Sequence, residues 1–141
     1  MICAFFGHSD TPPGIRGKLK DAVIDLIENH GANLFYVGNH GSFDRLATAV
    51  LRELSAVYPH IRYYIVLAYL TGCIPKDVPT MFPEGIECVP KRFAIDFRNK
   101  FMVKQSDVII SYVTHSFGGA AKFTKMAKNK GAEIINIANL S

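Results

Sequence analysis

Short apolar runs alternate with longer amphipathic stretches along the chain, and this alternation limits the possible folds more than any other feature. The apolar runs lie at residues 2–6, 34–37, 61–69, 107–113 and 133–137, with lengths typical of buried strands. Apolar residues recur at helical spacing between them, in residues 15–30, 42–58, 91–106 and 119–130. Strands that alternate with helices pair in parallel through right-handed crossovers. The sequence therefore predicts a doubly wound, three-layer, Rossmann-like α/β fold whose mainly parallel five-stranded sheet has the order 3-2-1-4-5.

Length and composition favour one globular domain over residues 1–141, because the apolar share is 49% and the charged share 20%. The N-terminal residues lack the basic region and the long apolar run of a signal peptide or a membrane span. Three scattered cysteines predict neither a disulfide framework nor a zinc site. We therefore expect a cytoplasmic protein without membrane contact, metal or cofactor. The net charge of +4 suits an anionic small ligand, and also serves solubility.

Residues 71–90 contain four prolines and two glycines, so no regular element is expected there. A loop of that length inside a compact domain usually has a function. In the following helix, Phe93, Phe97 and Phe101 recur at every fourth position and are expected to form its buried face.

The predicted strand order places the first and fourth strands side by side at the topological switch point, where open α/β sheets bind ligands. Residues 7–10 and 114–119 would then form one site. Gly7 and His8 open the first of these loops, which matches neither G-x-G-x-x-G nor the Walker pattern. A plain turn that caps the next helix is the alternative for this loop.

A second loop with two glycines, residues 38–44, follows the second strand. Gly38 and Asn39 would let the backbone approach a ligand, and Ser42 is expected to cap the next helix or take an oxyanion with the free amides there. Asp44 either interacts favourably with the helix dipole, because it lies in the first turn, or accepts a hydrogen bond from a ribose hydroxyl. Capping alone would explain the same residues.

Two further stretches supply candidates for ligand binding. Arg98, beside Asn99, is the best single anion anchor because a guanidinium binds phosphate through two parallel hydrogen bonds, although it could instead point to solvent. Residues 114–119 leave a buried strand and open a helix, a place where backbone amides cradle phosphate. The candidates in this stretch are Thr114, His115, Ser116, Gly118 and Gly119.

With these loops in place, the chain resembles the SLOG superfamily, which groups Smf/DprA and LOG-type Rossmann-like domains, and in particular a branch found in Firmicutes and their phages. The resemblance covers nearly the whole chain. It rests on F-G-H at 6–8, F-Y-V-G-N at 35–39, F-D at 43–44, F-P-E-G at 82–85, R-N at 98–99, Met102, S-D at 106–107 and T-H-S-F-G-G-A at 114–120. The resemblance implies that the site formed by these loops, at the carboxyl ends of the strands, binds nucleotides or nucleotide-derived ligands.

The chain departs from this resemblance at two positions. Relatives in the branch usually carry arginine where Ser9 stands, so the resemblance does not by itself imply a phosphate contact in the first loop. LOG phosphoribohydrolases use a helix arginine, matched by Arg98, and a glutamate whose position Phe123 occupies. A phenyl ring cannot serve as a general base, so glycosidic cleavage would require Glu84 or Glu87 as a substitute.

Three functions remain open from the sequence. The first is binding of a nucleotide or ADP-ribose-like molecule by a sensor or sequestering protein, with Tyr36, Tyr112 or Phe117 against the base. Such a protein could also form a homo-oligomer through its apolar helices. The second is a nucleoside-phosphate N-glycosidase that uses Glu84. The third, ranked last, is single-stranded nucleic-acid binding along a basic helix face, formed by Lys122, Lys125, Lys128 and Lys130.

Overall fold

A parallel six-stranded sheet forms the centre of the protein. The computed structural model describes residues 1–69 and 77–139, and the strand order is β4-β3-β2-β1-β5-β6. The strands are β1 (Ile2–Gly7), β2 (Leu34–Val37), β3 (Arg62–Val66), β4 (Thr80–Met81), β5 (Val108–Tyr112) and β6 (Glu133–Asn136). All pairs are parallel, and β1 pairs with β5 in the register Cys3 to Val108 through Gly7 to Tyr112. The predicted Rossmann-like class and the predicted order of the five main strands are confirmed.

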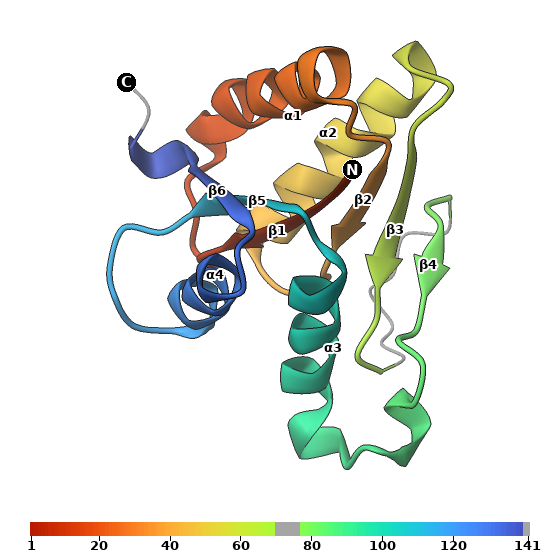
Figure 1. Ribbon diagram of the computed structural model, residues 1–141, viewed down its shortest axis with the longest axis vertical. Coiled ribbons are helices and arrows are strands. Elements are labelled where there is room, and N and C mark those ends of the chain that lie inside the picture. The colour runs from red at the N-terminus through yellow and green to blue at the C-terminus, as the bar shows by residue number, and fades with distance from the viewer. Residues whose placement is uncertain (70–76, 140–141) are drawn as a thin grey trace.

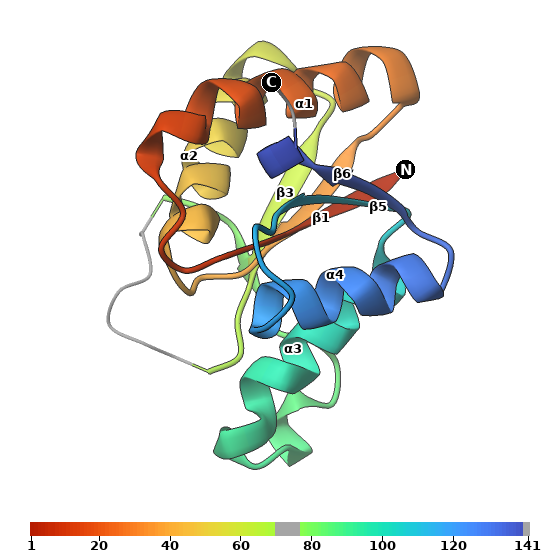
Figure 2. The ribbon, with the colours of Figure 1, turned by 90° about the vertical axis from the view of Figure 1, so that its left-hand side faces the viewer.

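Helices cover both faces of the sheet, as Figures 1 and 2 show. The helices α1 (Arg16–His30) and α2 (Ser42–Val57) lie on one face, while α3 (Lys91–Gln105) and α4 (Gly119–Asn129) lie on the other. Three short 3₁₀ helices complete the elements: η1 (Pro13–Ile15), η2 (Ile86–Cys88) and η3 (Ile137–Asn139).

The side chains of β1 divide between two cores because successive residues of a strand point to opposite faces. Cys3 and Phe5 pack with α1 and α2, whereas Ala4 and Phe6 pack with α3 and α4. Both faces of this strand are thus buried, which explains its continuous apolar sequence.

Two expectations about the second half of the chain are wrong. Residues 71–90 were expected to lack regular structure, but β4 adds a sixth strand to the sheet edge and η2 follows it. The part of this stretch at residues 71–76 lies outside the described residues. A two-residue strand leaves no periodic pattern, and the prolines beside it hide it further.

The buried face of α3 is also displaced by one residue from the aromatic stripe. Its buried residues are Ala94, Arg98, Met102 and Val103, and Phe93 is 51% exposed. The aromatic spacing identified the helix but not the face that it buries.

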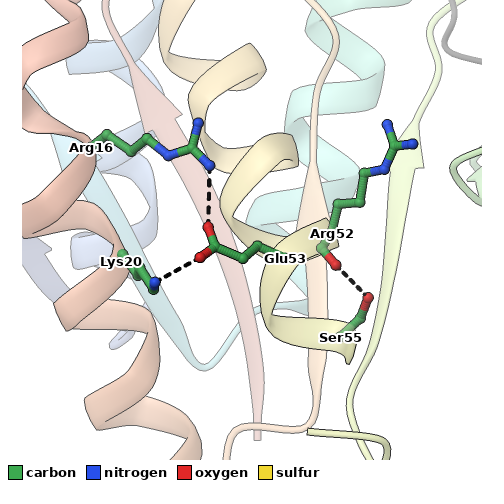
Figure 3. Close-up of polar contacts among 5 residues, drawn as sticks. All are labelled: Arg16, Lys20, Arg52, Glu53 and Ser55. Carbon is green, nitrogen blue, oxygen red and sulfur yellow. Dashed lines mark hydrogen bonds and ion pairs between the residues drawn. The ribbon is translucent and has the colours of Figure 1, made fainter. Parts of the chain in front are cut away.

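Ion pairs join the two helices of the other layer. Glu53 of α2 accepts hydrogen bonds from Arg16, at 3.1 Å, and from Lys20, at 2.7 Å, both in α1 (Figure 3). All three side chains are substantially exposed, so solvent weakens these pairs and apolar packing provides most of the contact between α1 and α2.

Candidate functional site

A cavity of about 410 Å³ lies at the carboxyl ends of β1, β2 and β5. Because β1 and β5 are neighbours, the loops that follow them meet at this edge. The Tyr112 carbonyl accepts a hydrogen bond from the His8 amide at 3.2 Å, and His8 Nε2 accepts one from the Thr114 amide at 2.9 Å. The two loops are therefore joined directly. We call this cavity the crevice.

Three aromatic rings are stacked on one wall of the crevice. The His8 and His115 rings lie 3.8 Å apart at 12°, and those of His115 and Phe117 lie 3.9 Å apart at 19°. Tyr112 meets the His8 ring edge-on. Burial and the neighbouring His115 lower the pKa of His8, and its bond from Thr114 requires an unprotonated Nε2. The inner ring of the stack is thus neutral.

Arg98 connects the opposite wall to the sheet. Its guanidinium is buried and donates to the Val66 carbonyl at 2.9 Å and to Asn99 at 2.7 Å, with a longer bond of 3.4 Å to Asn39. Its Nη2 lies 3.2 Å from His40 Nδ1. The solvent-facing alternative for this arginine is wrong, because the side chain crosses the protein interior and joins α3 to the end of β3.

Gly38 separates the guanidinium of Arg98 from the carboxylate of Asp44. A Cβ at this position would lie 2.8 Å from Asp44 Oδ2 and 3.0 Å from Arg98 Nη1, so only glycine fits without movement. Asp44 accepts a hydrogen bond from the His40 amide at 2.9 Å. Desolvation raises the pKa of Asp44 to about 6, although Arg98 opposes the shift.

The loop after β2 is fastened to the loop after β1. Ser42 donates its amide to the Ser9 carbonyl at 2.8 Å and its hydroxyl to the Thr11 carbonyl at 2.5 Å. Gly41 has a φ of 95°, and a Cβ there would lie 2.6 Å from the Ser9 Cα. Ser42 is the first residue of α2 and Gly41 is its N-cap, so the expected capping by Ser42 is wrong. Its amide is also not free for an oxyanion.

The first turn of α4 faces the crevice. Gly118 has a φ of 92°, and the first helical bond runs from the Lys122 amide to the Gly118 carbonyl. The amides of Gly119, Ala120 and Ala121 precede that bond and have no intrahelical acceptor. Gly118, Gly119 and Ala120 line the crevice, so the positive end of the helix dipole is directed at it.

Most of the predicted site residues meet in the crevice. The predicted residues that line it are Gly7, His8, Gly38, Asp44, Arg98, Asn99, His115, Gly118 and Gly119. The remaining predicted residues do not line it: Asn39, Ser42, Glu84, Thr114 and Ser116. Of the aromatic residues proposed against a base, only Phe117 lines it; Tyr36 is buried against Phe101.

Two residues, Glu84 and Ile95, show where the site differs from the expectation. Glu84 is exposed on the turn after β4 and does not line the crevice, so the structure places no glutamate from that loop over the site. Ile95 does line the crevice and was missed. Its position four residues before Asn99, on the same face of α3, was the available signal.

Within residues 1–69 and 77–139 no group of three or more His, Cys, Asp or Glu side chains could hold a metal ion. No helix in the same ranges combines the length and the apolar character needed to cross a bilayer.

The fold and the crevice define the class of the protein: a doubly wound α/β domain with a ligand-sized cavity at its switch point. The structure is similar to the crystal structure of DNA processing protein A (DprA) from Streptococcus pneumoniae, with a TM-score of 0.68 and 12% sequence identity. The similarity covers 94% of this chain and 48% of that chain, and at this identity it shows the fold. No protein-family model and no curated protein sequence matches the chain.

Proposed function

We propose that the protein binds a nucleotide, or a nucleotide-derived molecule such as ADP-ribose, in the crevice and acts as a sensor or sequestering protein. The observation that carries the proposal is the first turn of α4, where Gly119 and Ala120 line the cavity and have amides without an intrahelical acceptor. A volume of about 410 Å³ lies within the range of small-molecule sites.

The charges of the opposite wall support an anionic ligand. Arg98 is buried, and burial lowers its pKa more than the nearby Asp44 carboxylate raises it. A phosphate in the crevice would stabilise the guanidinium through space without replacing its existing hydrogen bonds. Arg98 thus acts in this proposal as a fixed positive charge.

Binding without hydrolysis is the version of this function that the residues favour. Phe123, at the position of the LOG-type glutamate, is buried and its ring stacks 5.8 Å from that of Phe6. It is a core residue that offers no acid or base. A glycosidase that uses Glu84 would need that exposed side chain to reach the crevice.

Variants of α4 test the site. Ala120→Glu places a carboxylate among the first-turn amides, where the helix dipole stabilises it and the fold should persist. We expect it to weaken nucleotide binding at least about tenfold through charge repulsion and occupation of the amides. Ala121→Glu is the matched control, because Ala121 lies on the same turn but outside the crevice. Calorimetry with a nucleotide panel measures both.

Mass spectrometry of the molecule released on denaturation, with assays of hydrolysis, completes this test. An intact nucleotide at near-stoichiometric amount, without turnover, is the expected result. Released base and sugar phosphate would show an enzyme, and equal binding by the two variants would place the ligand elsewhere.

A second candidate function, single-stranded nucleic-acid binding, is favoured by the distribution of charge. The helix α3 contains five Lys or Arg residues and α4 contains three, against one acidic residue, Asp96. The fold is that of a protein named for DNA processing, and we infer that the chain is a divergent member of the SLOG superfamily. Nucleic acid would then lie along the α3–α4 layer, with Phe93 or Phe117 against its bases.

A further inference from the structure

Phe117 is more exposed than its size and chemistry lead one to expect. It is 70% exposed, and the ring of His115 covers one of its faces at 3.9 Å. The other face is therefore open to the crevice, which Phe117 lines. The surrounding loop is otherwise polar and exposed, so folding does not require a phenyl ring there.

The rings behind Phe117 hold it in place. Its own carbonyl accepts the Nδ1 proton of His115 at 3.0 Å, and His115 stacks on the buried His8. His8 is in turn held by the Thr114 amide. Each ring is thus fixed by a hydrogen bond or by a fixed neighbour, so the outer face is arranged before any ligand arrives.

An aliphatic side chain lines the same cavity from the facing helix. Ile95 of α3 is 37% exposed, and α3 packs against α4. Both Ile95 and Phe117 thus present apolar surface to the crevice, which Gly119 and Ala120 at the start of α4 also line. A nucleotide combines a flat aromatic base, whose faces stack on apolar rings, with an anionic phosphate that a helix N-terminus can bind.

We propose that the crevice requires an aromatic base in its ligand, stacked on the open face of Phe117 with Ile95 lining its other side, on the platform of His115 and His8. This inference rests on the proposed nucleotide binding and deepens it, because it excludes sugar phosphates without a base as good ligands. Phe117 is then the residue that determines this specificity. It recognises any base, since every base has a stacking face.

A single tryptophan provides the direct readout. The chain contains no tryptophan, so Phe117→Trp introduces one fluorophore into the crevice. Phe93→Trp is the matched control, because Phe93 is an exposed phenylalanine of α3 that does not line the crevice. We expect AMP, GMP and CMP to quench the fluorescence of the Phe117→Trp protein saturably and to leave that of the Phe93→Trp protein unchanged.

Truncation separates stacking from loop shape. For Phe117→Ala we expect the affinity for AMP to fall about tenfold, within the range of base stacking on an aromatic side chain. Ribose 5-phosphate, which has no base, should bind weakly to the wild-type protein and with unchanged affinity to this variant. Calorimetry with both compounds measures the difference.

The possible outcomes distinguish a failure of the base requirement from a failure of nucleotide binding itself. If the wild-type protein binds neither the nucleotides nor ribose 5-phosphate, the proposed function fails. If it binds AMP and ribose 5-phosphate equally, or if Phe117→Ala weakens both to the same extent, nucleotide binding stands and the base requirement is wrong. Equal quenching in the two tryptophan variants would also overturn it.

Discussion

Gly7, at the end of β1, is required by the packing of the core. A Cβ on this residue would lie 2.2 Å from Cγ of the buried Phe43. The glycine was predicted as part of a ligand-binding turn, and it does border the crevice. Its lack of a side chain is nevertheless explained by the phenyl ring alone.

The contact predicts a defined stability loss. Gly7→Ala should lower the free energy of unfolding by about 1–3 kcal/mol, because the added methyl group overpacks the core. Phe43→Ala removes the Cγ, Cδ1 and Cδ2 atoms that the methyl group would meet, so the double variant should lose less than the sum of the two single losses. Urea denaturation measures all three proteins. Strictly additive losses would show that the methyl group is accommodated elsewhere.

The raised pKa of Asp44 predicts how the free energy of unfolding depends on pH. Its pKa rises from 3.8 to about 6 on folding, so the folded protein keeps this proton at pH values where the unfolded chain has lost it. The contribution of Asp44 to stability therefore falls as pH rises from about 4 to 6, by up to about 3 kcal/mol. Because burial lowers the pKa values of His8 and His40, these residues act in the opposite direction.

Comparison with Asp44→Asn isolates the carboxyl from the two histidines. The asparagine can still accept the hydrogen bond of the His40 amide but cannot titrate. The difference in unfolding free energy between wild type and variant should change across pH 4–6 and be constant above pH 7. A difference that is flat from pH 4 to 8 would contradict the raised pKa.

At the scale of elements, the side chain of Asn136 joins the end of β6 to the end of β5. Its Oδ1 accepts from the Val113 amide at 3.1 Å and from the Ala138 amide at 3.2 Å, and its Nδ2 donates to the Val113 carbonyl at 2.9 Å. The side chain thus continues the backbone pairing of β5 with β6 beyond the last paired residues. It also fixes the start of η3.

Removing this side chain should loosen one edge of the sheet. Asn136→Ala should lower the free energy of unfolding by about 1–3 kcal/mol, because partly buried backbone groups lose their partners. Hydrogen exchange should accelerate in residues 133–139 more than in β1 or β2. The control is Asn129→Ala, an exposed position at the end of α4. Unchanged exchange in residues 133–139 would show that β6 does not depend on this side chain.

The elements were predictable to the extent that their sequences were periodic. The five main strands are apolar because both sheet faces are covered, and this property is visible in the sequence. The strand β4 has two residues and no pattern of its own. The buried face of α3 was not predictable from hydrophobicity, because the protein buries Arg98 there among polar partners from β3 and the loop after β2.

The candidate site was predictable for a similar reason. Topology alone brings residues 7–10 beside residues 114–119, and strand order follows from the alternation of elements. The stack of His8, His115 and Phe117 depends on side-chain geometry, which a sequence pattern does not contain. The same is true of Ser42, whose partners lie in another loop.

At the scale of the whole molecule, the net positive charge of the four helices lies on one side of the sheet. Acidic and basic residues are equal in number within α1 and α2, whereas α3 and α4 have eight basic residues against one acidic residue. Seven of those eight are exposed; Arg98 is the buried one. The layer of α3 and α4 is therefore the surface to which a polyanion would be drawn.

This asymmetry gives the test of nucleic-acid binding. Binding of a single-stranded oligonucleotide, measured by fluorescence anisotropy, should weaken steeply as salt is raised, with a log–log slope of about −0.7 for each phosphate neutralised. Lys125→Glu in α4 should weaken binding about tenfold at low salt and reduce that slope. Arg62→Glu alters the net charge equally but lies in β3, and should have little effect. Equal losses in the two variants, or a shallow slope, would contradict an interface on α3 and α4.

The pairing of β1 with β5 also affects how the protein can be made. The ribosome produces β1 before the other strands of this sheet, yet the strand that covers one of its edges begins only at Val108, far along the sequence. Until then the apolar residues of β1 have only β2 as a neighbour in the sheet. Contacts that join distant parts of a chain form slowly and leave strand edges exposed to aggregation in the meantime. We therefore expect the nascent protein to depend on chaperones until β5 is released, and the crevice to be among the last parts to form.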